Sequence, residues 1–154
     1  MLLVFGFLNI GLVNAQTNSL NGTWIIDSEI TQIDSLVEMT FNNGNFESAV
    51  GGVLFSRGTY TASGGRYRMQ TTSIHGSSLG LLYGNSFGLE SRWYPKEQLR
   101  TALSPFLMLI MSVEEFSKMI DDMFSVETGT YSVSGNKLTM RKEGVTELFT
   151  YTRK

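Results

Sequence analysis

The sequence predicts a mainly β protein: an eight-stranded antiparallel up-and-down barrel with a helical insertion between strands 5 and 6. Eight β-rich segments are separated by tight-turn signals, two hairpins are related in sequence, and helical character interrupts the pattern once. Closure into a barrel suits such a meander because it leaves no unpaired sheet edge. The expected strands are 22–27, 36–41, 45–50, 54–62, 66–73, 127–133, 137–142 and 146–153.

Residues 58–69 and 129–140 are two versions of one hairpin. Six of the twelve aligned positions are identical, and each version has a Ser-Gly-Gly or Ser-Gly-Asn turn between two β-rich runs. Glycine supplies the positive φ that tight hairpin turns need. Only two copies occur, and unrelated sequence separates them, so they indicate similar corners of one sheet and not a solenoid.

Alternation with a period of two assigns the interior of the barrel. One face of the strands is mostly aromatic and methionine, whereas the other carries the charges; a shift of one residue would exchange the two sets. An outer-membrane barrel is disfavoured because its outward face would be apolar. The predicted interior set is Trp24, Ile26, Val37, Met39, Phe41, Phe46, Val50, Tyr60, Tyr67, Met69, Tyr131, Val133, Leu138, Met140, Phe149 and Tyr151.

The insertion spans about 79–125. Pro95 is expected at the first position of a helix, Pro105 is expected to stop or restart it, and Ser112 with Glu115 forms a capping box for a second helix. The apolar stripe of the second helix could pack on the barrel and close one end, form a methionine-rich lid, or be exposed as a dimer or partner surface. The candidate lid or partner residues are Phe106, Leu107, Ile110, Met111, Phe116, Met119 and Met123.

The first 13 residues form an uncharged apolar run that is too short to span a bilayer as a folded anchor. The run ends at Val13-Asn14-Ala15, whose small residues suit a signal peptidase. We therefore expect a signal peptide at 1–15 with cleavage after Ala15, and one mature domain at 16–154 that is secreted or periplasmic. The absence of cysteine excludes disulfides and a lipid-modified N-terminal cysteine.

Composition narrows the available chemistry. With 12 basic and 14 acidic residues the net charge is −2, so no phosphate-binding surface and no nucleic-acid partner are expected. His75 is the only histidine, and without cysteine it cannot form the usual zinc sets. No nucleophile-elbow, phosphate-loop or calcium-loop motif is present. We expect no cofactor, no metal and no enzymatic activity; a catalytic role for His75 ranks third among the hypotheses.

The first and last strands of the predicted barrel carry residues that are typical of a known family. Gly22-Thr23-Trp24 on the first strand and Arg153 on the last resemble the lipocalins and, more broadly, calycin-type barrels; 20–69 and 126–154 are similar to secreted bacterial lipocalin-like domains. The resemblance implies that Arg153 stacks over Trp24 at a closed end and that the other end is open to a small hydrophobic molecule. The chain departs from the family because its helical segment precedes strand 6 and the Thr-Asp-Tyr motif is absent.

The leading hypothesis is therefore an exported binding protein whose barrel holds a small hydrophobic molecule. Gly22, Trp24 and Arg153 have the structural role of closing the barrel. The alternative is a cell-envelope interaction module with a side-chain-filled barrel, whose apolar insertion binds a second copy or an envelope protein. The predicted ligand-binding residues are Tyr60, Tyr67, Met69, Tyr131, Met140 and Phe149.

Overall fold

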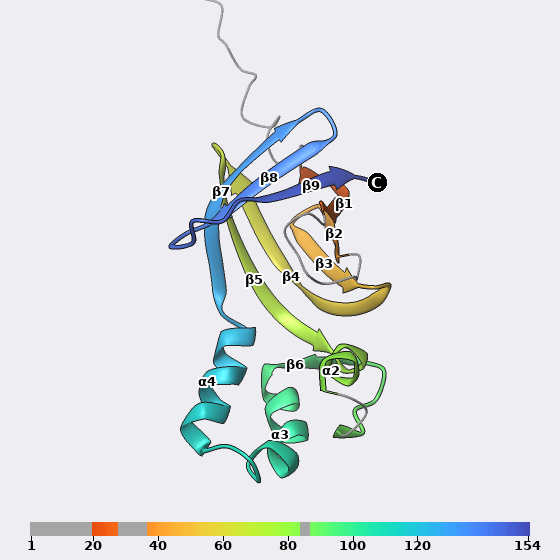
Figure 1. Cartoon of the computed structure of the whole chain (residues 1–154), viewed down its shortest axis with the longest axis vertical. Helices are drawn as coiled ribbons and strands as arrows, with labels where there is room; N and C mark the ends of the chain where they lie inside the picture. Colours follow the sequence, from red (N-terminus) through yellow and green to blue (C-terminus); the bar gives the residue numbers. More distant parts are fainter. Residues whose placement is uncertain (1–19, 28–36, 84–86) are drawn as a thin grey trace, which may run out of the picture.

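The computed structural model describes residues 20–27, 37–83 and 87–154. Within these ranges nine strands form one sheet, and eight of them close into an antiparallel barrel (Figure 1). The predicted fold class is thereby confirmed, and the closed barrel is consistent with a calycin-like fold. The strands are β1 (Gly22–Ile26), β2 (Val37–Asn42), β3 (Asn45–Val50), β4 (Val53–Ser63), β5 (Arg66–His75), β6 (Trp93–Pro95), β7 (Val126–Ser134), β8 (Lys137–Lys142) and β9 (Phe149–Arg153).

Two pairings that are not between consecutive strands complete the ring. β5 pairs with β7 across the insertion, with Tyr67 opposite Gly129, and β1 pairs with β9, with Trp24 opposite Arg153. The last residues of β5 continue beyond the barrel, where they pair with the short strand β6. The expected strand positions hold to within two residues at each end, except that β9 begins at Phe149 and not at 146.

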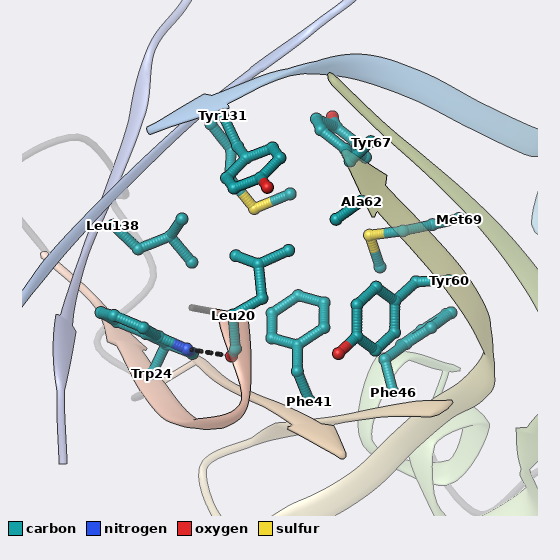
Figure 2. Close-up of a cluster of buried hydrophobic side chains, with 11 residues drawn as sticks. Leu20, Trp24, Phe41, Phe46, Tyr60, Ala62, Tyr67, Met69, Tyr131 and Leu138 are labelled. Atoms are coloured by element: carbon teal, nitrogen blue, oxygen red, sulfur yellow. Dashed lines mark hydrogen bonds between the residues drawn. The ribbon is translucent and has the colours of Figure 1, made fainter. Parts of the chain in front are cut away.

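A plug of side chains fills one end of the barrel. The Trp24 side chain is fully buried, its Nε1 donates a hydrogen bond of 2.8 Å to the Leu20 carbonyl, and Leu20 lies between Trp24 and the aromatic side chains of the opposite wall (Figure 2). The Arg153 Cζ atom lies 4.5 Å from the centroid of the Trp24 ring. Gly22 has a φ of 129°, which favours glycine at the start of the motif. The buried barrel core is Leu20, Trp24, Phe41, Phe46, Tyr60, Ala62, Tyr67, Met69, Tyr131, Leu138 and Met140.

The insertion builds a second apolar core beyond the far end of the barrel (Figure 1). It consists of α2 (Gly76–Tyr83), β6, α3 (Lys96–Leu107) and α4 (Val113–Met123), and it begins three residues earlier than expected. No helix in the described ranges is long and apolar enough to cross a membrane. The buried residues of this second core are Ile74, Leu79, Tyr94, Leu99, Leu103, Leu107, Phe116, Ile120 and Phe124.

Two expectations for the insertion were wrong and one is confirmed. Pro95 is the N-cap of α3 and not its first residue, and Pro105 lies inside α3. A proline costs a helix one backbone hydrogen bond, but the helix continues to Leu107 because that side chain is buried in the second core. The capping box that starts α4 is confirmed: Ser112 Oγ accepts from the Glu115 backbone, and the Glu115 carboxylate accepts from the Ser112 backbone.

Candidate functional site

A cavity of about 300 Å³ occupies the barrel at the end opposite Trp24. Strands β2 to β5 and β7 to β9 supply its walls, and the residues at the end of α4 border it where the chain enters β7. The cavity therefore lies where the barrel meets the insertion. Its lining residues are Met39, Phe46, Ser56, Tyr67, Met69, Thr71, Asp122, Met123, Ser125, Glu127, Met140, Lys142, Phe149 and Tyr151.

Part of the wall is flexible and apolar. Four methionines border the cavity, three from strands and Met123 from the end of α4, together with Phe46 and Phe149. Methionine has an unbranched, polarisable side chain that fits irregular apolar ligands. Because closure of the sheet satisfies the strand backbones, the barrel can keep this space without unpaired backbone groups. The wall can therefore hold an apolar molecule without specifying its shape closely.

One side of the cavity is polar. The Tyr67 hydroxyl donates a hydrogen bond of 2.8 Å to Glu127 Oε1, while Lys142 Nζ lies 3.4 Å from Glu127 Oε2. The side chains of Glu127 and Lys142 are 38% and 46% exposed, so this ion pair faces the mouth and not the depth of the barrel. A partly exposed pair with one long contact is weak, and its partners can separate at small cost.

Two tyrosines in the cavity are held in their neutral form. Burial, followed by its hydrogen bond with Glu127, raises the pKa of Tyr67 far above its usual range. Burial, followed by repulsion from the Glu127 carboxylate, raises the pKa of Tyr151 to about 12. Both phenols therefore keep their protons at neutral pH, and each offers a ligand an aromatic ring and a hydroxyl group.

The end of α4 forms one rim of the cavity. Asp122, Met123 and Ser125 border it, and Gln70 on β5 donates a hydrogen bond of 2.6 Å from Nε2 to the Phe124 carbonyl. This bond fixes the chain just before β7. The carbonyl end of a helix carries a partial negative charge, so this rim adds to the potential of the Asp122 carboxylate.

Four of the six predicted ligand-binding residues border the cavity: Tyr67, Met69, Met140 and Phe149. The other two belong to the filled core nearer the closed end. Tyr60 donates a hydrogen bond of 2.9 Å from its hydroxyl to Asn21, and Tyr131 is buried in the same cluster. Alternation shows only that a side chain points into the barrel. It cannot show whether the space around that side chain is packed or empty.

Glu127 and Lys142 were missed because their charge placed them outside the expected apolar set. The alternation itself contained the signal. On β7, Glu127 lies two positions before Gly129, which faces inward. On β8, Lys142 lies two positions after Met140, which also faces inward. Continuing the two-residue alternation to the start of β7 and to the end of β8 would have placed both side chains on the cavity face.

The candidate lid residues do not form one surface. Leu107 and Phe116 are buried in the second core, with Met111 and Met119 packed partly against it. Met123 borders the cavity, so it is the one member of the set that could act as a lid. Phe106, in the last turn of α3, is 42% exposed, and Ile110, in the turn between α3 and α4, is 77% exposed. The stripe of α4 is thus mainly the insertion's own core, not a cover for the barrel.

Two further features lie outside this cavity. A hollow of about 700 Å³ at the closed end is bordered by Arg66 and Arg68, which alternate with the inward residues of β5, and by Glu143. His75 is buried against the Trp93 ring, and its Nδ1 has no hydrogen-bond partner among the described residues. In the ranges that the structure describes, no group of three or more histidine, cysteine, aspartate or glutamate residues could hold a metal ion.

Comparison with known proteins gives no relative from which a function could be assigned. No protein-family model matches the chain, and neither a curated protein nor a solved structure matches it.

Proposed function

We propose that the protein is an exported, lipocalin-like binding protein that holds a small hydrophobic molecule in its barrel. The cavity of about 300 Å³ beside α4 is the observation that supports this function. Its volume is at the lower end of the range for small-molecule sites, and its walls are mainly methionine and aromatic side chains, as in such sites. The Gly22-Thr23-Trp24 segment and Arg153 support the lipocalin-like assignment, and the apolar run before Ala15 supports export.

Binding of a neutral fluorescent apolar probe, naphthalene, tests the binding function. Thr71 borders the cavity and is partly buried, so Thr71→Trp should fill the space and abolish probe binding. Thr59→Trp is the matched control because Thr59 is exposed on β4. Probe binding that is absent in the wild type, or equal in the two variants, would contradict the proposal.

The exposed turn between α3 and α4 supports a second candidate function, an interaction module. Leu109 is 83% exposed and Ile110 is 77% exposed, with Phe106, Met108 and Val113 also exposed nearby. Neighbouring exposed apolar side chains of this size are typical of protein contacts. A second copy of the chain is the simplest partner, with an envelope protein as the other possibility.

Sedimentation velocity distinguishes this second function from the first. Leu109→Asp with Ile110→Asp should convert a dimer to a monomer without changing binding of the fluorescent probe. Leu148→Asp is the control, since Leu148 is an exposed apolar residue far along the chain from the turn. Leu107 is unsuitable for this test because it is buried in the second core. A wild-type chain that is monomeric at all concentrations would contradict self-association.

A further inference from the structure

We propose that the ligand of the barrel cavity is a small amphiphile with a protonated amine group. Its apolar chain would lie among the methionines, and its ammonium group would lie at the mouth between Glu127 and the end of α4. This inference rests on the proposed binding function and deepens it. The charged side chains around the cavity lie at its mouth, whereas methionine and aromatic side chains make up much of the rest of its wall.

Two carboxylates and one ammonium group border the mouth: Asp122, Glu127 and Lys142. Lys118 lies outside the lining and pairs with Asp122 at 2.6 Å, and both side chains are mostly exposed, so solvent screens both charges of this pair strongly. The helix end adds partial negative charge at the same rim. An arriving cation therefore meets a more favourable potential than an anion does.

The Glu127 carboxylate has an acceptor position for such a cation. Among the residues that the structure describes, Oε1 accepts from the Tyr67 hydroxyl at 2.8 Å, whereas Oε2 has only the 3.4 Å contact with Lys142. Charge-assisted hydrogen bonds between ammonium and carboxylate are usually 2.7–2.9 Å long, so the Oε2 contact is weak. Because the Lys142 side chain is 46% exposed, its ammonium group can turn into water and be replaced by that of the ligand.

The aromatic wall also favours a cation. The rings of Tyr67 and Tyr151 border the cavity on the side of Glu127. The face of an aromatic ring attracts ammonium groups, and the interaction strengthens where water is excluded. A carboxylate at the same place would face Glu127 and gain nothing from the rings.

The volume limits the length of the apolar chain. A cavity of about 300 Å³ corresponds to about ten water molecules at about 30 Å³ each. A straight-chain amine with roughly that number of non-hydrogen atoms therefore fits, whereas a sterol or a two-chain lipid does not. We choose n-octylamine as the probe.

The test compares three compounds with the same chain and different head groups: n-octylamine, 1-octanol and sodium octanoate. Isothermal titration calorimetry with the full chain should show that the amine binds about three- to tenfold more tightly than the alcohol, and the carboxylate most weakly. Added salt should weaken binding of the amine and leave that of the alcohol nearly unchanged, because salt screens only the charged head group.

Glu127→Gln should bring the amine to within about twofold of the alcohol, since the amide keeps an acceptor for Tyr67 but removes the charge. Glu47→Gln makes the same change on the exposed face of β3 and should keep the preference of the wild type. Asp122→Asn, at the exposed end of α4, provides a second variant that leaves the barrel wall intact and should reduce the preference.

The outcomes separate this inference from the proposed function. Equal binding of all three compounds, or tightest binding of octanoate, would overturn the amine assignment while the apolar binding function stands. Retention of the full amine preference in both Glu127→Gln and Asp122→Asn would overturn it as well. If none of the compounds binds and Thr71→Trp changes nothing, the binding function itself fails.

Discussion

The barrel and the insertion bury apolar side chains in two different ways. In the barrel, closure of the sheet pairs the backbones of all eight strands, so the wall stands even where its interior is hollow. In the insertion, each helix satisfies its own backbone, and burial of side chains such as Leu99 and Ile120 is what holds the helices together. This difference explains why the cavity lies on the barrel side of the junction and the exposed apolar turn on the helical side.

The two tryptophans give the largest expected difference between the regions. Each lies under an arginine, Arg153 over Trp24 at 4.5 Å and Arg57 over Trp93 at 4.6 Å, but only Trp24 is fully buried. Trp24→Ala should lower the free energy of unfolding by about 3 to 5 kcal/mol. Trp93→Ala should lower it by about 1 to 2 kcal/mol. Urea unfolding measures both, and an equal loss in the two variants would contradict the comparison.

A leucine in each core tests whether the regions unfold together. Leu99 and Leu138 are both fully buried, and replacement of either by alanine should cost about 3 kcal/mol. Leu99→Ala should speed amide hydrogen exchange in α3 and α4 and leave β1 and β9 protected, because the barrel closes without the insertion. Leu138→Ala should speed exchange in both regions. Uniform loss of protection in Leu99→Ala would show a single cooperative unit.

The capping box of α4 gives a smaller effect that is confined to the insertion. Ser112→Ala removes the acceptor for the Glu115 backbone and should cost about 1 kcal/mol in thermal unfolding. Ser132→Ala, on the exposed face of β7, is the control and should change stability by less than about 0.5 kcal/mol. If the two substitutions cost the same, the cap does not stabilise α4.

The smallest expected effects on stability come from two aspartates, one in each region, and they appear at low pH. Hydrogen bonds from Lys137 and Thr152 lower the pKa of Asp27, which links β1 to β8 and β9. A hydrogen bond from Lys96 lowers the pKa of Asp121, which links α4 to α3. Because each folded pKa is depressed, each contribution is present above the usual value of 3.8 and is lost as the pH falls below it.

Carboxyl titration by NMR spectroscopy measures both pKa values directly. Both should lie below the ordinary value for aspartate. Asp27→Asn should weaken the pH dependence of exchange protection in β9, and Asp121→Asn should do the same in α4. Each variant controls for the other, and a normal pKa for either aspartate would show that its ion pair does not stabilise the fold.

The strands and their inward faces could be predicted because both depend on neighbouring residues. Glycine turns fix each hairpin, and the alternation at Phe41, Tyr67 and Met140 fixes which side of each strand faces inward. Much of the insertion could not be predicted in this way. The pairing of β6 with the end of β5, and the continuation of α3 past Pro105, depend on contacts between segments distant in sequence.

The sequence by itself determined the eight strands, which face of each strand points inward and the capped start of α4. Each follows from a local pattern whose physical cause lies within a turn, a strand or one helix end. Only the tertiary structure decided that Met69 and Phe149 border the cavity beside α4 while the inward-facing Tyr60 and Tyr131 do not. It also brought Glu127 and Lys142 to the mouth beside α4, because the space left between packed segments depends on side-chain volumes summed over distant parts of the chain.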